Sequence, residues 1–138
     1  MHNINYFNFD QTNHPISDEI NEWIQRCLVE LALVTEQINY VFCTDEELLT
    51  VNKEFLNHDY YTDIITFDLR DNTEDPLLAD IFISLERVND NAQNNNIENS
   101  LELKRVMIHG ILHICGYSDK TPESTAVMRE KENHFIYL

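Results

Sequence analysis

Two patterns of apolar residues predict strands along this chain. In some segments apolar and polar side chains alternate, as in a strand with one buried face. In others, β-branched and aromatic residues form a short apolar run. Strands are therefore predicted over four segments: Ile4–Phe9, Ile38–Cys43, Ile64–Phe67 and Ile81–Ile83.

Helices are predicted where apolar residues recur at a spacing of three and four positions. Ser and Thr mark their starts, because these side chains accept hydrogen bonds from the free N–H groups of a first turn. Five helices are expected: they begin after Ser17 and Thr44, cover Leu85–Gln93, and begin near Asn99 and after Thr121. The order of elements predicts a single α+β domain over residues 1–138, with a four-stranded mixed sheet and about five helices packed on it.

Composition and charge narrow the classes of function. The 138 residues include only two glycines, which excludes the Gly-rich phosphate loops of dinucleotide-binding proteins and P-loop NTPases. Nine Lys and Arg residues against 25 Asp and Glu residues give a formal charge of −16, a poor overall match to nucleic acid. Residues 104–131 are an exception, because they carry a net charge of +2 and leave −18 for the remainder.

The chain has no apolar run of the length needed to cross a membrane. Its first residues also lack the basic and apolar regions of a secretory leader, so a cytoplasmic protein without membrane attachment is expected. Three cysteines, an odd number set in apolar surroundings, are predicted to be reduced core residues rather than metal or redox sites: Cys27, Cys43 and Cys115.

Two histidines carry the strongest chemical signal. They lie in the helix that begins near Asn99 or Ser100, which is apolar almost all round from Val106 to Cys115 and is therefore expected to be buried. His109 and His113 are four residues apart, so both side chains lie on one face of the helix, where two imidazoles can reach one metal ion. The alternative is a structural pair of histidines satisfied by hydrogen bonds. The sequence favours a metal site at a cleft beside this helix.

Both glycines of the chain lie next to these histidines. Gly116 follows the last apolar residue and is predicted to end the helix in a left-handed cap, so that the next loop delivers Asp119 as a third ligand. Gly110 lies inside the helix, where glycine costs about 1 kcal/mol relative to alanine. Either a close approach by another backbone or substrate, or tight helix packing, would account for it.

Two histidines and one carboxylate leave one coordination position open. Structural zinc sites normally have four protein ligands, so this set indicates a catalytic site. Non-haem iron accepts the same ligands, and nickel is not excluded. The zinc proteases with an H-E-x-x-H helix carry a general base at the second position, where this chain has Gly110. A protease of that type is therefore not expected.

The residues of this helix resemble the YbeY family of bacterial rRNA maturation factors, which are described as metal-dependent endoribonucleases. The family pattern H-G-x-L-H-x-x-G-Y-D-H matches residues 109–117, and the last two positions carry Ser118 and Asp119. Supporting segments upstream resemble the family's L-N-x-x-Y-R, P-T-D-V-L-S-F and G-D-I-x-I-S motifs: Asn52–Leu56, Tyr61–Phe67 and Ala79–Ser84.

The resemblance implies an α+β fold with one zinc ion held by three side chains, and a role in 16S rRNA 3′-end processing and ribosome quality control. Single-stranded rRNA and ribosomal particles would then be the partners. Asp119 replaces the family's third histidine, which adds a negative charge and should make a zinc-bound water less acidic. Leu56 replaces the arginine that is thought to hold the RNA phosphate, so that role cannot be assigned to this position.

Other residues have two possible interpretations each. Asp63 and Asp80, at strand ends, could orient a ligand or act as a base, or simply be solvated. His58 could contact phosphate or be a surface residue. Three tyrosines could stack RNA bases or pack against the core: Tyr60, Tyr61 and Tyr117. The remaining histidines are predicted to be surface residues: His2, His14 and His134.

The leading hypothesis is a metal-dependent endoribonuclease with His109, His113 and Asp119 as zinc ligands. Lys104, Lys120 and Arg129 are the candidate phosphate contacts, and the general base is not identified. A ribosome-associated binding module with a structural or vestigial metal is the first alternative. A metallohydrolase that acts on a substrate other than RNA is the second.

Overall fold

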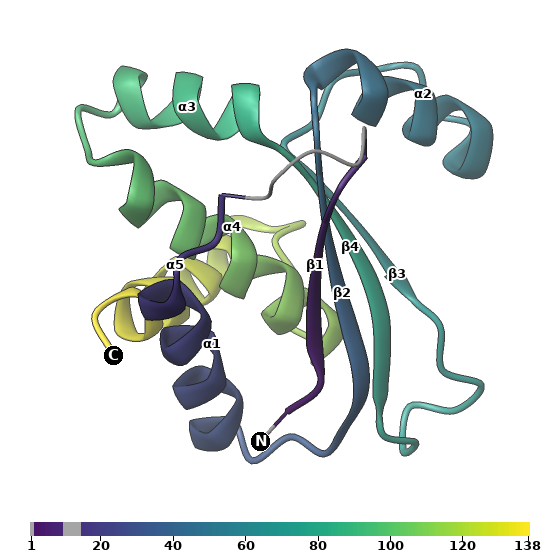
Figure 1. Cartoon of the computed structure of the whole chain (residues 1–138), viewed down its shortest axis with the longest axis vertical. Helices are drawn as coiled ribbons and strands as arrows, with labels where there is room; N and C mark the ends of the chain where they lie inside the picture. Colours follow the sequence, from purple (N-terminus) through teal and green to yellow (C-terminus); the bar gives the residue numbers. More distant parts are fainter. Residues whose placement is uncertain (1, 10–14) are drawn as a thin grey trace.

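The structure is a computed structural model that describes residues 2–9 and 15–138. A four-stranded sheet runs through its centre, with the strands in the spatial order β1-β2-β4-β3 (Figure 1). The strands are β1 (Ile4–Asn8), β2 (Thr35–Cys43), β3 (Ile64–Asp68) and β4 (Leu77–Ser84). The first three in spatial order are parallel, and β3 is antiparallel to β4, which confirms the predicted mixed sheet.

Five helices accompany the sheet, as predicted. They are α1 (Asp18–Glu30), α2 (Asp45–Leu56), α3 (Leu85–Asn94), α4 (Asn99–Ile114) and α5 (Pro122–Ile136). Ser17, Thr44 and Thr121 cap α1, α2 and α5 through their side-chain oxygens. At α2 the predicted capping box is complete, because Glu47 returns a hydrogen bond to the Thr44 N–H.

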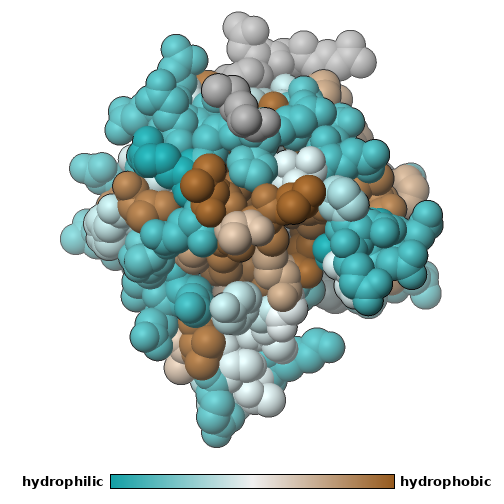
Figure 2. Space-filling view, turned by 90° about the horizontal axis from the view of Figure 1, so that it is seen from below, coloured by the Kyte–Doolittle hydropathy of each residue, from teal (hydrophilic) through white to brown (hydrophobic). Residues whose placement is uncertain are grey.

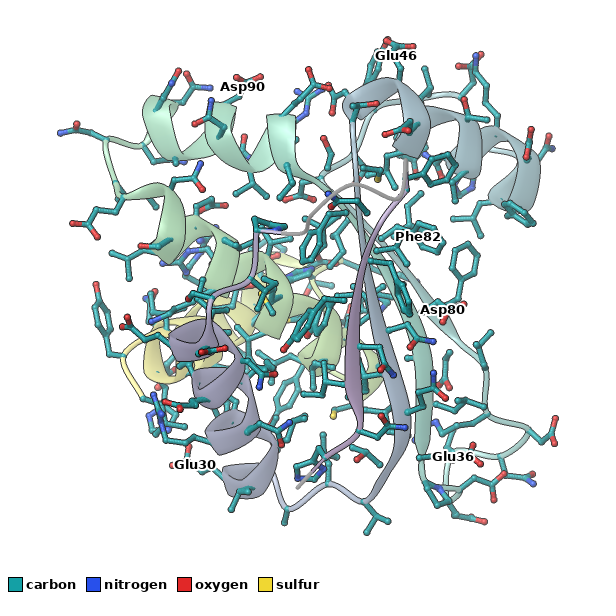
Figure 3. The ribbon with its side chains drawn as sticks, viewed as in Figure 1. Glu30, Glu36, Glu46, Asp80, Phe82 and Asp90 are labelled. Carbon is teal, nitrogen blue, oxygen red and sulfur yellow. The ribbon has the colours of Figure 1, made fainter. Side chains whose placement is uncertain are left out.

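The helices divide between the two faces of the sheet. Helices α1, α4 and α5 cover one face, while α2 lies on the opposite side at one end of the strands (Figure 1). The alternation of β4 explains this division: Ile81 and Ile83 are fully buried in the large core, whereas Phe82 packs into a smaller cluster with residues of α2. Figure 3 shows Phe82 and Asp80 on the face of β4 that turns away from α1, α4 and α5.

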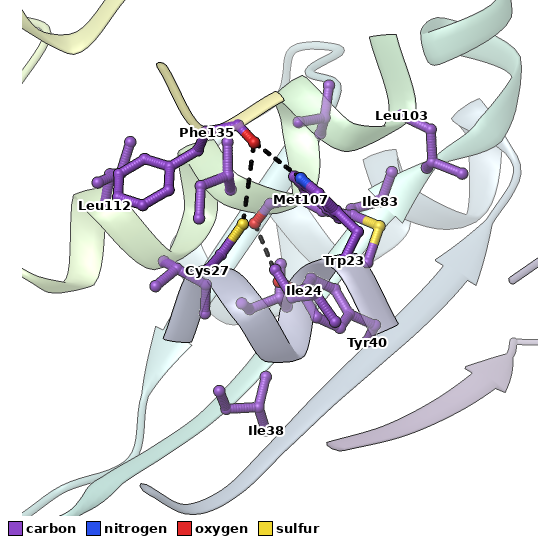
Figure 4. Packing of buried hydrophobic residues seen from close by; sticks show 14 of the residues in the cluster. Trp23, Ile24, Cys27, Ile38, Tyr40, Ile83, Leu103, Met107, Leu112 and Phe135 are labelled. Carbon is purple, nitrogen blue, oxygen red and sulfur yellow. Dashed lines mark hydrogen bonds between the residues drawn. The ribbon is translucent and has the colours of Figure 1, made fainter. Parts of the chain in front are cut away.

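Polar atoms inside the large core are satisfied by hydrogen bonds that join distant elements. The Tyr40 hydroxyl on β2 donates to the carbonyl of Met107 on α4 at 3.0 Å (Figure 4). The indole N–H of Trp23 on α1 donates to the carbonyl of Phe135 on α5 at 2.8 Å. The first bond ties α4 to the sheet, and the second ties α1 to α5. Helix α4 is the helix that carries the histidine pair.

Gly110 lies where α4 presses against the sheet. A β-carbon at this position would lie 2.9 Å from Ile64 Cδ1, 3.2 Å from Ile81 Cγ2 and 3.3 Å from Thr66 Cγ2. Of the two explanations for this glycine, the structure supports tight packing, because the nearest neighbours are core side chains of β3 and β4.

Several predictions about single residues need correction. Cys27 and Cys43 are buried as expected, but Cys115 is exposed because it caps the end of α4. Asp80 is not at a strand end, since β4 is longer than predicted and places it in mid-strand. His134 is exposed, as predicted, and pairs with Glu30. His2 is only half-exposed and is bonded to Thr35, whereas His14 lies outside the described residues.

The surface is largely hydrophilic, as the composition requires. Figure 2 shows one end of the molecule, where hydrophobic residues gather near the middle and hydrophilic residues surround them. Among the helices of the described segments, none is both long enough and apolar enough to cross a bilayer.

Candidate active site

Helix α4 presents the two predicted histidines one turn apart. The ring centroids of His109 and His113 are 6.4 Å apart, and the ring planes are inclined by 28°. The His109 side chain is 22% exposed, whereas His113 is an exposed residue at the end of the helix. The i, i+4 spacing therefore places both rings on one face, as the sequence predicted.

Gly116 ends α4 and turns the chain back. Its φ of +103° lies in the region that side chains disfavour, and its N–H donates to the His113 carbonyl at 3.1 Å. The N–H of Tyr117 donates to the Leu112 carbonyl at 3.1 Å. These two bonds form a Schellman motif, which confirms the predicted left-handed cap.

The loop after Gly116 brings Asp119 back to the helix. Asp119 Oδ2 lies 3.6 Å from His109 Nε2. The hydroxyl of Thr125, in the second turn of α5, donates to the Asp119 carbonyl at 2.9 Å and so ties the loop to that helix. The structure thus brings together the first and third of the predicted metal ligands.

The other ring nitrogen of His109, Nδ1, is hydrogen-bonded to Glu132 on α5. Glu132 Oε2 lies 2.7 Å from His109 Nδ1, and the Glu132 side chain is only 5% exposed. This hydrogen bond, more than the opposing effect of burial, raises the pKa of His109. Burial acts to raise the pKa of Glu132. The hydrogen bond and charge of His109, together with Arg105 and Arg129, outweigh this effect and lower the pKa. Glu132 is therefore ionised.

An ionised carboxylate can only accept hydrogen bonds, so the Nδ1 atom of His109 must carry the shared proton. In the neutral ring, Nε2 then bears the lone pair, and Nε2 is the atom that faces Asp119. This is the arrangement by which carboxylates orient metal-binding histidines in proteins. Helix α5 therefore sets the direction of a side chain on α4.

Two arginines lie within ion-pair distance of one oxygen of Glu132. Arg105 Nη1 lies 3.2 Å from Glu132 Oε1, and Arg129 Nη1 lies 3.5 Å from the same oxygen. Sequence reasoning missed Glu132 and Arg105. Their contact joins α4 to α5 across 27 residues of sequence, and no local sequence pattern around either residue predicts it.

Two cavities meet at His109. One has a volume of about 410 Å³ and is lined by residues of α3, α4 and α5 that include Glu102, Arg105, Arg129 and Glu132. The other, of about 490 Å³, runs along the loop after α2 and the start of β3. Both are lined by Asp63, His109 and Asp119. Burial raises the pKa of the Asp63 carboxyl, which lies between the two cavities.

The structure separates the predicted phosphate contacts. Lys120 lines the larger cavity, and Arg129 lines the smaller one with 60% of its side chain exposed. Lys104 lines neither: its ammonium group lies 5.5 Å from the ring centre of Trp23. Asp80 also lines neither cavity and accepts a hydrogen bond from Asn39 on β2 at 3.0 Å.

The donor atoms around His109 suit a metal ion in chemistry and in spacing. Two atoms that each bind a tetrahedral zinc at about 2.0–2.1 Å lie roughly 3.4 Å apart. The 3.6 Å between His109 Nε2 and Asp119 Oδ2 is close to that value and too long for a good hydrogen bond. Over residues 2–9 and 15–138, no three His, Cys, Asp and Glu side chains are gathered closely enough to form a metal site as they stand. The three-ligand set stays a prediction.

Comparison with known proteins tests the resemblance seen in the motifs. The family model described as "Endoribonuclease YbeY" matches residues 6–137. The chain belongs to the YbeY family. The predicted family is therefore confirmed, together with the class of enzyme, an endoribonuclease, and YbeY endoribonucleases are in general metal-dependent.

Curated YbeY relatives match most or all of the chain. The chain is 44% identical to "Endoribonuclease YbeY" of Flavobacterium johnsoniae over 140 residues, which cover all of this chain and 96% of that protein. It is 46% identical to the protein of the same name in Cytophaga hutchinsonii over 120 residues, 87% of this chain and 83% of the relative.

A solved structure confirms the fold. The solution structure of a Thermotoga maritima protein matches 99% of this chain and 87% of its own, with a TM-score of 0.67 and 24% identity. The likeness bears on the fold alone, since the two sequences have diverged widely. It agrees with the α+β architecture that the sequence predicts.

Proposed function

We propose that the protein is a zinc-dependent endoribonuclease that cleaves single-stranded rRNA in the cytoplasm, in the 3′-end maturation of 16S rRNA and in ribosome quality control. One zinc ion per chain is held by His109, His113 and Asp119. The observation that carries this proposal is the placement of His109, whose Nδ1 is bonded to Glu132 while its Nε2 faces Asp119 at 3.6 Å.

Each side chain around His109 has a distinct task in this proposal. A bound zinc ion supplies a Lewis acid and a water molecule of lowered pKa. Glu132 holds the His109 ring in the tautomer that leaves Nε2 free. Asp63 lines both cavities beside His109, so its carboxyl group is placed to exchange a proton with the substrate.

The RNA backbone runs past His109 from one cavity to the other. Lys120 in the larger cavity and Arg129 in the smaller one contact phosphates on either side of the cleaved bond. Lys104 has no place in this path, because it covers Trp23. Ribosomal particles are the source of the single-stranded rRNA segments, and co-sedimentation with them measures that association.

The metal assignment is tested by elemental analysis of the purified protein. We expect one zinc ion per chain in the wild type and almost none in His113→Ala. His134→Ala is the matched control, because it removes an exposed histidine that lies outside the site, and it should keep its zinc. Unchanged zinc in His113→Ala would overturn the assignment of the ligands.

The catalytic role is tested by RNA cleavage with protein freed of contaminating nucleases. His109→Ala should abolish cleavage of a single-stranded RNA, whereas His134→Ala should cleave at the wild-type rate. Cleavage that survives in His109→Ala would show that this site has no catalytic part and would favour a ribosome-binding module. An absence of salt-dependent RNA binding in the wild type would favour a substrate other than RNA.

A further inference from the structure

One wall of the larger cavity is a loop held in place by one buried residue, through both its backbone and its side chain. Asn52, in the last turns of α2, is only 1% exposed. Its carbonyl accepts hydrogen bonds from the N–H groups of Asn57 and His58, and its side-chain amide donates to the Tyr60 carbonyl at 2.9 Å. Asn57 takes the left-handed conformation that the turn requires, with φ of +55°. The positions of His58 and Tyr60 are therefore fixed by the backbone.

His58 and Tyr60 form a stacked pair on this wall. Their ring centroids are 5.2 Å apart with an interplanar angle of 22°, and the Tyr60 hydroxyl lies 3.1 Å from His58 Nδ1. Both residues line the larger cavity, yet Tyr60 is 55% exposed. An aromatic pair that is ordered, largely uncovered and beside a cavity offers a ready surface to another flat ring.

The other two candidate tyrosines are engaged elsewhere. The Tyr61 hydroxyl donates to Glu46, and the Arg87 guanidinium lies 5.7 Å from its ring centre. Tyr117 packs against the large core, with the Lys131 ammonium 5.8 Å from its ring centre. Neither lines the larger cavity. Of the three tyrosines, only Tyr60 combines exposure with a place on that wall.

We propose that the His58–Tyr60 pair is a stacking subsite for one unpaired base of the RNA, beside the bond that is cut. This proposal rests on the proposed function. The same cavity is lined by His109, His113 and Asp119, and by the positively charged side chain of Lys120. A base that stacks on Tyr60 would place its backbone next to these residues.

The chemistry of the wall favours a base over a phosphate. Leu56, 39% exposed, lines the cavity at the position where the family pattern has a phosphate-binding arginine. This wall therefore presents apolar and aromatic surface rather than a fixed positive charge. Every base has a π-face, so such a surface binds single strands with little sequence preference.

The affinity of the zinc-loaded protein for a fluorescent, cleavage-resistant 2′-O-methyl oligoadenylate tests this subsite. Tyr60→Leu should weaken binding about 10-fold in a fluorescence anisotropy titration, and Tyr60→Phe should keep most of the affinity. Tyr61→Leu is the matched control, because it removes a neighbouring exposed tyrosine that does not line the cavity. Its affinity should stay within about twofold of the wild type.

A second variant reports stacking directly and does not depend on a loss of binding. The fluorescence of Tyr60→Trp should be quenched when the oligoadenylate binds, since a stacked base quenches an indole. Tyr61→Trp should show no such quenching. The natural tryptophan, Trp23, is 1% exposed and contributes a constant background to both proteins.

The outcomes separate this proposal from the proposed function. If the wild type neither binds nor cleaves RNA, the proposed function fails, and the subsite fails with it. If the wild type cleaves RNA while Tyr60→Leu binds as tightly and Tyr60→Trp is not quenched, the subsite alone is overturned. Weakened binding in Tyr60→Leu with quenching in Tyr60→Trp supports both.

Discussion

One buried carboxylate controls the histidine at the centre of the site. Glu132 accepts the hydrogen bond of His109 Nδ1 and balances the charge of Arg105, with a side chain only 5% exposed. Its removal would leave the His109 ring free to rotate and Arg105 without its buried partner. The residue therefore acts on the site through its hydrogen bond to His109.

A substitution of Glu132 tests this role. We expect Glu132→Ala to lower the zinc affinity about 10- to 100-fold, the usual effect of losing a carboxylate that orients a metal ligand. Glu132→Gln retains an acceptor for the His109 N–H and should lose less. A competition titration with a chromophoric chelator measures the affinity. Glu130→Gln, at an exposed position of the same helix, is the control, and an equal loss in it would contradict the prediction.

Gly110 makes a prediction about packing. A methyl group there would crowd Ile64, Ile81 and Thr66, at the cost of about 1–3 kcal/mol typical of overpacking. The gain in helix propensity offsets about 1 kcal/mol of it. We therefore expect Gly110→Ala to lower the free energy of unfolding by about 1 kcal/mol, the difference between these two effects.

The closest neighbour provides the control for this packing argument. Ile64→Val removes the Cδ1 atom that lies 2.9 Å from the new methyl group. The double variant should therefore be more stable than the sum of the two single effects predicts, which a urea-denaturation cycle measures. If the two stability changes are strictly additive, the Cδ1 atom of Ile64 is not what crowds the new methyl group.

Single residues show where sequence reasoning succeeds and where it stops. His109, His113 and Gly116 stand in a local pattern whose spacing alone places them on one helix face or at its end. Glu132 has no such pattern, because its function depends on how α5 docks against α4. Lys104 was expected near phosphate, but the ring of Trp23, 81 positions earlier, lies beneath it.

At the scale of elements, the end of α4 and the start of α5 form one unit. Gly116 reverses the chain, Thr121 caps α5, and Thr125 bonds the carbonyl of Asp119 between them. The loop that carries the candidate third ligand is thus held at its start by the backbone hydrogen bonds of Gly116 and Tyr117, and at its end by the side-chain hydrogen bonds of Thr121 and Thr125. Its geometry should respond to changes at either end.

Gly116→Ala isolates the contribution of the turn. A β-carbon at this position meets no atom within 4 Å, so the whole effect arises from the φ of +103°. We expect a loss of about 1 kcal/mol in the free energy of unfolding, measured by urea denaturation. Gly116→Asn should lose less, because asparagine tolerates the left-handed region better. Equal losses in the two variants would argue against backbone strain as the cause.

The elements themselves were largely predictable, because the signals for them are local. The caps at Ser17, Thr44 and Thr121 mark helix starts through hydrogen bonds made within three residues. Two strands begin earlier than predicted: β2 begins at Thr35 and β4 at Leu77, since these residues pair with each other across the sheet. The strand order β1-β2-β4-β3 depends on pairing between strands that are distant in sequence, and no pattern within a single strand predicts that pairing.

At the scale of the whole molecule, the charge of −16 sets how RNA can bind. Glu102, Glu132, Asp63 and Asp119 surround the smaller cavity, and Arg105 is already paired with Glu132. Few cations are therefore free for phosphates. In the proposed function, the energy of RNA binding therefore comes mainly from stacking and from the metal site rather than from charge.

The salt dependence of RNA binding measures this balance. Each phosphate neutralised on a single strand contributes a slope of about −0.7 to log K against log salt. With Lys120 and Arg129 as the contacts, we expect a slope of roughly −1.4, twice that value. Lys120→Ala should lower its magnitude by about 0.7, while Lys104→Ala should leave it unchanged. A slope several times steeper would reveal a basic surface other than these two residues.

The docking of α5 also has a consequence for the order in which the site is assembled. Ribosomes synthesise α5 after α1, α4 and the whole sheet, and α5 supplies both Glu132 and the carbonyl that receives the Trp23 indole. Until that helix emerges and packs, His109 has no partner to orient it. The histidine pair is therefore present in the growing chain before the carboxylate that aligns His109 has been added.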